Sequence, residues 1–512
     1  MHHLSKKQVQ FLKQNPESMK IFQNIPTDSY PLLEPIRYKG TVLYCNIYLE
    51  FKYRISLACI WVNTFGKHSI SKIPLVYTET QPFDVYNKIS RNYTHSFLFE
   101  SLEGPDELAE TSIMGFDPEI IVKGYFDKIT IQNRDGKIET IQTDAPLEEI
   151  KKLIKKTDDM SYRYLGGAVG NIDYDAIRLF ENIPGKKDLE KPIMEFGIYN
   201  DGILYDNKKK QFFYFYYDED RKDKIKKTDE DVGTFEMSDI DINLNKEQFE
   251  QIVNKAKEYV HSGDVFQVVL SRRFSFEAKG DYLRVYEKLR ELNPSPYMFH
   301  LKMDENVIIG SSPEMLLRVT GRDVETFPIA GTRKITEDEE KNEKLKNELL
   351  NDEKELAEHT MLVDLGRNDI GRVCDYGTVK VKELMEIKRF SHVQHIVTHV
   401  VGKLNEKNDM YDAFEAVFPA GTVSGAPKVR AMEIIQELEP TQRETYAGAV
   451  GYFSFNGCCD FAIAIRSIFA NKERGFVQAG AGIVFDSIAE NELKETEHKA
   501  NAMITALKEA SK

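Results

Sequence analysis

The sequence predicts an α+β fold in which large antiparallel β-sheets carry helices on their outer sides. Two observations lead to this class. Strand-like segments come in runs separated by turns, and helical segments do not alternate strictly with them. The chain also has 512 residues, 41% of them apolar, so it can bury a substantial core and is long enough for two lobes or domains.

The expected elements are placed along the chain by their periodicity. Strands are expected at 136–144 and 211–220, and the charged run 217–234 is expected to be a solvated linker between two lobes. A helix is expected over 245–263, because its apolar residues recur at helical spacing and form one face. Gly263 suits the left-handed residue that ends such a helix.

The second half of the chain predicts further helices and strands. The expected helices cover about 336–360, 430–439 and 489–510. The expected strands are 264–278, 377–384, 392–404, 448–455, 460–470 and 475–485. Most of these strands follow one another without an intervening helix, which favours antiparallel sheets over a parallel α/β arrangement.

Residues 1–72 differ from the rest of the chain. They hold ten Lys or Arg against four Asp or Glu, and they contain the single tryptophan, Trp61. The favoured interpretation is an atypical N-terminal extension, and a small additional domain is the alternative.

Composition excludes several classes of function. The formal charge of −14 disfavours binding to nucleic acid, and no run of 18 apolar residues predicts a membrane span. No signal-peptide pattern is present, and the five cysteines are scattered. An odd, unpatterned set of cysteines is typical of reduced thiols, so a cytoplasmic protein is expected.

Two pairs of glutamates with the spacing E-x-x-E lie on predicted helices. Glu355 and Glu358 form one pair, and Glu492 and Glu495 form the other. Residues three apart share a helix face. The face of each helix that carries the glutamates, here called its stripe, continues into apolar residues, so the carboxylates are expected to point inward. Such a set suits Mg²⁺, which prefers oxygen ligands. Two surface helices with ordinary Glu–Lys pairs remain the alternative.

Three further features suggest a small anionic ligand. Ser424 and Pro427 are expected at the start of a helix, whose first N–H groups can bind an anion. Gly480 and Gly482 would let a ligand approach the backbone, and Arg466 interrupts an apolar strand. Each feature could equally be structural. Together with the glutamates they predict a pocket for a small dicarboxylate.

Eight motifs in order along residues 74–510 resemble the chorismate-utilising enzymes, and most closely the large subunits of anthranilate synthases. They are PIAGTR, ELAEHTMLVDLGRNDIGRV, VQHIVTHV, AGTVSGAPKVRAMEII, YAGAVGYF, AIAIRS, QAGAGIV and ENELKETEHKA. The resemblance implies a two-lobed sandwich of sheets, with an N-terminal region over 73–235 and a chorismate-binding catalytic domain over 240–512. It also implies a lyase that forms anthranilate and pyruvate from chorismate and ammonia, the first committed step of tryptophan biosynthesis.

The resemblance assigns a role to each matching residue. Glu358 and Glu495 would bind Mg²⁺ directly, with Glu355 and Glu492 in support. Glu314 in the SSPE segment would be the acid that protonates the departing ring hydroxyl. The other catalytic candidates are His395, at the reacting ring, and Thr422. The remaining substrate contacts would be Thr332, Tyr446, Arg466, Gly480, Gly482 and Lys499.

Two other segments resemble the tryptophan-inhibitor site of the same family. They are HSFLFESLEG and NPSPYMFHL, and they predict feedback inhibition. The residues expected at this site are Leu98, Glu100, Ser101, Asn293, Pro294, Tyr297 and Met298. The chain departs from the family pattern at Phe99, where Leu is usual. The alternative is that both segments only pack in edge strands.

No cysteine lies in the G-x-C-x-G-x-Q setting of a glutamine amidotransferase. The chain is therefore expected to receive ammonia from a separate amidotransferase subunit, in a hetero-oligomer, or to use free ammonia.

Related activities are separated by single positions. Isochorismate and salicylate synthases resemble one another in having a lysine base on a strand. Gln267 occupies the matching position here and cannot serve as that base. Ala330 stands where many aminodeoxychorismate synthases carry a lysine nucleophile. Some of the latter enzymes lack that lysine, so an aminodeoxychorismate synthase remains the alternative. A scaffold protein that has lost its chemistry is disfavoured, because none of the expected site residues is replaced.

Overall fold

The computed structural model describes residues 70–75, 81–103, 110–185, 187–228, 232–389 and 393–512, and the backbone of four short strands before them. The chain divides into two units, 1–67 and 68–512. In the first unit the short strands form two antiparallel pairs, β1 (Ile36–Tyr38) with β2 (Thr41–Leu43) and β3 (Asn46–Tyr48) with β4 (Ser56–Ala58). The expected extension 1–72 lies almost entirely outside the described residues and stays a prediction.

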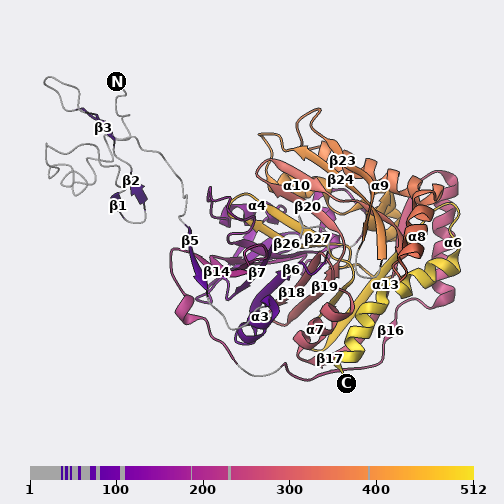
Figure 1. Cartoon of the computed structure of the whole chain (residues 1–512), viewed down its shortest axis with the longest axis horizontal. Coiled ribbons are helices and arrows are strands. Elements are labelled where there is room, and N and C mark those ends of the chain that lie inside the picture. Colours follow the sequence, from indigo (N-terminus) through magenta and orange to yellow (C-terminus); the bar gives the residue numbers. More distant parts are fainter. Residues whose placement is uncertain are drawn as a thin grey trace. The chain divides into compact units, whose positions relative to one another are not determined.

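The second unit contains two large sheets in its described part (Figure 1). The 13-stranded sheet has the order β15 (Phe235–Met237), β17 (Gln267–Gly280), β29 (Arg474–Ile483), β28 (Ser467–Ala470), β19 (Asn306–Ser312), β18 (Tyr297–Met303), β6 (His95–Glu100), β7 (Thr111–Phe116), β13 (Asp201–Asp206), β14 (Gln211–Tyr217) and β5 (Ile70–Leu75). Two short strands, β16 (Asp241–Ile242) and β25 (Gly425–Ala426), also pair with β17.

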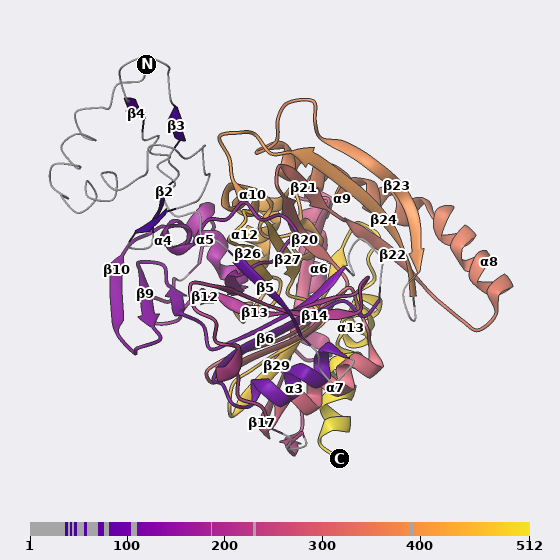
Figure 2. The same ribbon diagram turned by 60° about the vertical axis from the view of Figure 1, so that its left-hand side comes forward.

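The 12-stranded sheet has the order β10 (Ile138–Gln142), β9 (Lys128–Asn133), β8 (Ile120–Gly124), β12 (Met194–Tyr199), β11 (Gly167–Ile172), β26 (Ala449–Ser454), β27 (Cys459–Ile463), β20 (Met315–Thr320), β21 (Asp323–Thr326), β24 (Val393–Lys403) and β22 (Ile329–Lys334). In addition, β23 (Lys380–Arg389) pairs with β24, on the edge opposite to β22, at one end of the sheet (Figure 2). Each described pairing in both sheets is antiparallel, which confirms the predicted fold class.

The described helices are α3 (Pro82–Ser90), α4 (Pro146–Leu153), α5 (Ile177–Phe180), α6 (Lys246–Ser262), α7 (Tyr282–Leu292), α8 (Glu339–Leu350), α9 (Glu353–Gly371), α10 (Met410–Val417), α11 (Gly421–Ser424), α12 (Lys428–Leu438) and α13 (Ala489–Ala510), with short 3₁₀ turns at Tyr174–Ala176 and Lys222–Lys224. No helix in this described set is both long and apolar enough to cross a membrane.

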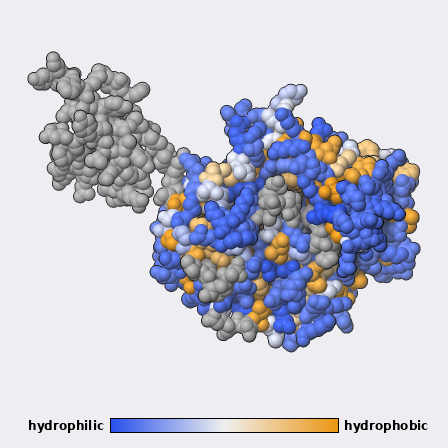
Figure 3. Space-filling model, viewed as in Figure 1, coloured by the Kyte–Doolittle hydropathy of each residue, from blue (hydrophilic) through white to orange (hydrophobic). Residues whose placement is uncertain are grey.

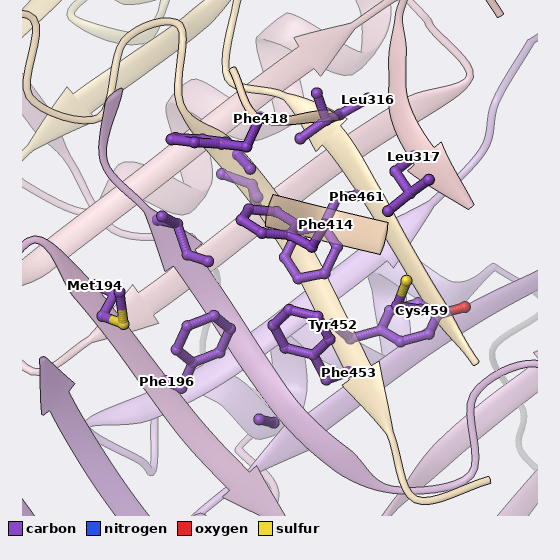
Figure 4. Close-up of a cluster of buried hydrophobic side chains, with 14 of the residues drawn as sticks. Met194, Phe196, Leu316, Leu317, Phe414, Phe418, Tyr452, Phe453, Cys459 and Phe461 are labelled. Atoms are coloured by element: carbon purple, nitrogen blue, oxygen red, sulfur yellow. The ribbon is translucent and has the colours of Figure 1, made fainter. Parts of the chain in front are cut away.

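Apolar side chains from both sheets meet in one large core. Phe299 of the 13-stranded sheet and Tyr452 of the 12-stranded sheet belong to the same buried cluster. On the outer side of the 12-stranded sheet, Phe414 of α10 packs against Phe453 and Phe461, with ring centroids 5.7 and 4.9 Å apart (Figure 4). The sheets therefore form a sandwich with helices outside it.

Helices cover the 13-stranded sheet with two further clusters. Side chains of α3, α7 and α13 pack on its central strands, and α6 and α12 pack on β17 and β29. The face of the second unit shown in Figure 3 is mainly hydrophilic, with hydrophobic residues in separate small groups. Strands from 73–235 and from 240–512 occur in both sheets. The proposed division between these ranges stays a prediction.

Several predicted elements are confirmed at their own residues. The last helix runs over Ala489–Ala510, as expected, and α6 ends at Gly263, which adopts φ 83°. Two expectations about helices are wrong. The helix expected over 336–360 is two helices, because Asp352 accepts a hydrogen bond from Glu355 N–H and starts α9 anew. Ser424 does not cap α12, because β25 separates them, and its hydroxyl donates to Ala420 O at 2.8 Å.

Candidate active site

The chain passes between the two sheets at two adjacent places, and each crossing carries a charged side chain. Glu314 lies between β19 and β20, and Arg466 lies between β27 and β28. The crossings bond to each other: Ile463 N–H donates to Glu314 O, and Ser311 N–H donates to Arg466 O, both at 3.1 Å. The backbone therefore holds a carboxyl group and a guanidinium cation close together where the two sheets meet.

Arg466 shows that the strand expected over 460–470 is wrong. Its backbone takes the left-handed value φ 51°, which ends β27 and lets the chain begin β28 in the other sheet. Burial lowers the pKa of the half-buried Arg466, and Tyr446, Glu495 and Glu314 oppose that shift. Within the described residues its guanidinium makes no hydrogen bond or ion pair. A half-buried cation of this kind is suited to a carboxylate ligand.

Glu314 has the protonation state that a general acid requires. Its side chain is buried, and burial raises its pKa to about 8, although Thr422, Lys499 and Arg466 lower it. At neutral pH this carboxyl is therefore mainly protonated and able to donate. The Thr422 hydroxyl is close enough to influence Glu314, yet it has no well-formed hydrogen bond within the described residues.

His395 is neutral and its tautomer is determined by its hydrogen bond. Its Nδ1 lies 2.9 Å from Gly331 O and 3.1 Å from Thr332 Oγ1. A carbonyl can only accept, so Nδ1 carries the proton and Nε2 is left as an acceptor. Burial lowers the pKa of His395 to about 4, and Arg466 and Lys499 add to that shift. A bulge in β22 between Ala330 and Thr332 presents the Gly331 carbonyl to this ring.

Gly480 and Gly482 lie on β29, where Gly480 faces the expected substrate contact Tyr446 and Gly482 faces Gln267. A Cβ atom at Gly480 would lie 2.9 Å from the Tyr446 hydroxyl, and one at Gly482 would lie 2.7 Å from Nε2 of Gln267. Lys499 of α13 donates to Gly480 O at 3.0 Å and pairs with Glu495 at 2.6 Å. The glycines therefore let the Tyr446 and Gln267 side chains approach the backbone of β29, where a Cβ atom would push them away.

The four predicted metal ligands influence one another across two helices. Burial raises the pKa of Glu358; Lys354 opposes this, and Glu355, Glu495 and Glu492 add to it. Burial also raises the pKa of Glu492, and Glu495 adds to that shift. The carboxylates of α9 and α13 therefore lie within range of one another's charge. Clustered carboxylates with this mutual repulsion match the charge and oxygen donors that a hard divalent ion prefers.

The same carboxylates also have cationic partners. Glu355 pairs with Arg333 at 3.2 Å, and Glu358 lies 3.8 Å from Lys354. Among the described residues, no three His, Cys, Asp or Glu side chains lie close enough together to hold a metal ion. Binding of a divalent ion would require these side chains to turn, and magnesium therefore stays a prediction.

A cavity of about 60 Å³ lies between the sheets at the predicted inhibitor segments. Of the seven expected residues, Glu100, Ser101, Tyr297 and Met298 line it, whereas Leu98, Asn293 and Pro294 do not. Leu98 instead packs among the helices on the outer side of the 13-stranded sheet. Alternation along the strand separates Leu98 from Phe99, which lines the cavity.

Glu100 and Tyr297 of this cavity already have partners, whereas the buried Ser101 hydroxyl makes no hydrogen bond within the described residues. Glu100 accepts from Tyr286 at 2.8 Å and from Arg290 at 2.6 Å, and Tyr297 donates to Asp460 at 3.0 Å. Outside the cavity lining, Asn293 donates to Ser311 at 2.8 Å. The opposite wall comes from the other sheet, and no sequence pattern predicted it. Its residues are Val450, Gly451, Tyr452, Asp460 and Ala462.

Comparison with known proteins identifies the family. Residues 94–505 match the family model described as chorismate binding enzyme. The chain belongs to the chorismate-binding enzymes. It is 46% identical over 453 residues to anthranilate synthase component 1 of Methanothermobacter marburgensis, covering 88% of this chain and 98% of that protein.

Two further relatives compare the branches of this family. The crystal structure of anthranilate synthase component I from Streptococcus pneumoniae superposes with a TM-score of 0.69 at 38% identity, covering 78% of this chain and 93% of that one. Aminodeoxychorismate synthase component 1 of Bacillus subtilis is 40% identical, covering 82% of this chain and 93% of that protein. The aminodeoxychorismate relative is the more distant of the two curated sequences, so the alternative activity is not favoured.

Proposed function

We propose that this chorismate-binding enzyme converts chorismate and ammonia into anthranilate, pyruvate and water. The observation that carries the proposal is the pair of crossings, which holds a protonated carboxyl, Glu314, near a cation without a partner among the described residues, Arg466. Chorismate is a dicarboxylate that must lose a ring hydroxyl in this reaction. The pair supplies one group for a carboxylate and one proton for the hydroxyl.

In the first step, ammonia adds to the ring carbon beside the carboxylated one, the ring double bonds shift, and the hydroxyl leaves. Glu314 gives its proton to this hydroxyl, which departs as water. In the second step the aminated carbon loses its proton to Nε2 of His395, the ring becomes aromatic, and the bond to the enolpyruvyl oxygen breaks. The enolpyruvyl group leaves as an enolate, which takes up one proton at its methylene carbon and becomes pyruvate. The nitrogen added in the first step gives up one proton, so the protons balance.

Arg466, the Tyr446 hydroxyl and the backbone at Gly480 and Gly482 are assigned to the enolpyruvyl carboxylate. Thr332 and Thr422 are assigned to polar groups of the ring, and Lys499 fixes the position of Glu495.

Mg²⁺ is proposed as the cofactor, held by the four glutamates of α9 and α13. It would neutralise the ring carboxylate and draw electron density toward it. The mutual pKa effects among Glu358, Glu492 and their neighbours support this assignment.

The reaction is tested by mixing purified chain with chorismate, Mg²⁺ and ammonium at about pH 8. We expect a fluorescent aromatic product with the mass of anthranilate and one pyruvate per product, since the proposal balances to these species. A non-aromatic aminated product without pyruvate would place the chain in the aminodeoxychorismate branch. No turnover at all would contradict both activities.

The source of ammonia is proposed to be a separate amidotransferase subunit. The three described cysteines are poor nucleophiles: burial raises the pKa of Cys374 to about 11, and it also raises the pKa of the buried Cys458 and Cys459. Anthranilate synthase component 1 is the name of the relatives above, and a numbered component implies a second one.

The chain alone should therefore use ammonium but not glutamine. Initial rates with saturating glutamine in place of ammonium should stay at background, and addition of a purified component II from a relative should restore them. Glutamine-dependent turnover by the chain alone would contradict the proposed partner.

Feedback inhibition by tryptophan is proposed to occur at the cavity lined by Phe99 and Tyr297. Its volume of about 60 Å³ is only about twice the share of one water in the liquid, about 30 Å³, so an indole ring needs rearrangement to enter. The Phe99 ring packs 5.4 Å from that of Phe97 and 6.3 Å from that of Phe299. This ring thus occupies space that the inhibitor would need.

Replacing Phe99 with leucine should make the enzyme more sensitive to tryptophan, lowering the inhibition constant by about tenfold, because a smaller side chain enlarges the cavity. The measurement is the rate of anthranilate formation against tryptophan concentration. Phe212→Leu is a matched control, since Phe212 is a buried ring in the outer cluster of the same sheet. Equal inhibition of wild type and Phe99→Leu, or no inhibition at millimolar tryptophan in either protein, would contradict this site.

A further inference from the structure

Arg443 is a fully buried arginine with a single acidic partner. Its side chain is among the largest that the described structure fully buries. It forms a bidentate pair with Glu439, in which Nε donates to Oε2 at 2.9 Å and Nη2 donates to Oε1 at 2.7 Å. A buried ion pair costs desolvation energy and is weak evidence for stability. Its other contacts, to the carbonyls of Val269 and Val423, indicate what the pair holds in place.

The pair takes the place of a missing neighbour strand along β17. On this edge, β25 pairs only with Gln267 and Val268, and β16 pairs only with residues 274–275. Between them, Arg443 Nη2 donates to Val269 O at 2.8 Å, and Ser271 N–H donates to Glu439 Oε1 at 2.8 Å. Residues two apart in a strand present their backbone groups to the same side, so the two side chains satisfy one continuous edge.

The same guanidinium also contacts two segments that carry expected site residues, α11 and the segment around Tyr446. Its Nη1 donates to Val423 O at 2.7 Å, next in the chain to Thr422, at the end of the four-residue helix α11. Its charge also lies over the Tyr446 ring, 5.7 Å from the centroid. Val269, whose carbonyl accepts from Arg443, pairs with Gly482 of β29, so the guanidinium is also linked to a third segment of the site.

We propose that the Arg443–Glu439 pair is a positioning element that fixes Thr422, Tyr446 and the Gly482 strand pair relative to one another. Neither side chain needs to touch the substrate in this role. The planar fork of Arg443 serves two carbonyls and one carboxylate at once, which a lysine ammonium cannot reproduce. The proposal rests on the function proposed above, because Thr422 and Tyr446 are assigned to the substrate there.

The test compares Arg443→Lys with Arg221→Lys. Arg221 is a matched control because it also pairs with a buried acid, Asp201 of β13. It pairs in addition with Asp117, in the turn between β7 and β8, at 2.6 Å. Both acids lie away from the candidate site. We expect kcat of Arg443→Lys to fall by about 10- to 100-fold, since a misplacement of about 1 Å can cost that much. Arg221→Lys should keep the wild-type kcat.

The pH profile separates positioning from a general loss of folded protein. Thr422 lowers the pKa of Glu314, so displacement of Thr422 should move the alkaline limb of kcat/KM to higher pH. Arg443→Lys should show this shift in the same direction as Thr422→Val. A merely structural role would scale the whole profile down and leave the limb in place.

Amide hydrogen exchange provides a readout that needs no turnover. Arg443→Lys should exchange faster over 269–271 and 421–424, and Arg221→Lys should not. If wild type makes no anthranilate, the proposed function fails, and this comparison alone decides the positioning role. Wild-type kcat, an unmoved alkaline limb and unchanged exchange at these segments in Arg443→Lys would overturn the inference, even if the melting temperature falls.

Discussion

Replacing Glu314 with glutamine should lower kcat by about 10²- to 10⁴-fold, the usual contribution of a general acid. The amide fills the same volume, but it cannot release a proton to the departing hydroxyl. The KM for chorismate should change little, because Arg466 and Tyr446 are assigned to binding. Steady-state rates of anthranilate formation with saturating ammonium measure this effect.

The pH dependence should change together with the rate. Burial holds the pKa of Glu314 at about 8, and the acid must be protonated to act. For wild type, kcat/KM should therefore fall as pH rises through about 8, when it is measured at constant free ammonia. This limb should vanish in Glu314→Gln, because no proton is left to lose there.

Glu195→Gln is the matched control for Glu314→Gln. Glu195 is also a buried carboxyl whose pKa is raised by burial, yet it pairs with Lys123 and faces none of the site residues described above. Its substitution should leave both kcat and the alkaline limb unchanged. An alkaline limb that persists in Glu314→Gln would assign proton donation to another group and contradict the proposed role.

Local features of this molecule could be predicted from sequence, because they depend on neighbours in the chain. The helix over 489–510 follows from its own periodicity, and its bounds match the structure. The i, i+3 spacing of the glutamates likewise predicted inward-pointing carboxylates. Of the four only Glu492 is buried, whereas Glu355, Glu358 and Glu495 are partly exposed.

Features that depend on pairing between distant strands could not be predicted. The apolar segment around Arg466 continues without a turn residue, so its periodicity predicts one strand, and only the change of sheet partner ends it at φ 51°. The wall of the inhibitor cavity shows the same limit. Tyr452 and Asp460 reach the cavity from the other sheet, more than 300 residues beyond Phe99 in the chain.

Removal of divalent ions should abolish turnover, and Mg²⁺ should restore it. Glu358→Gln should raise the Mg²⁺ concentration for half-maximal activity by about 10- to 100-fold or more. Loss of a group that only holds a metal ligand in place already costs this much affinity, and Glu358 is assigned as a ligand itself. Calorimetric titration of Mg²⁺ into the enzyme with chorismate gives the same comparison without relying on rates. The expected effect is large because Glu358 is assigned to bind the ion directly, and its amide replacement removes one of the charged oxygen ligands that Mg²⁺ prefers.

Glu353→Gln is the control on the same helix, because Glu353 is exposed in the first turn of α9 and lies off the stripe of Glu355 and Glu358. It removes the same charge from nearly the same place, so a general electrostatic effect would appear in both variants. A selective change in Glu358→Gln assigns the ion to the stripes of α9 and α13. If chelation leaves turnover intact and Glu358→Gln needs no more Mg²⁺ than Glu353→Gln, the glutamates serve only in their pairs with Arg333, Lys354 and Lys499, and the metal assignment is wrong.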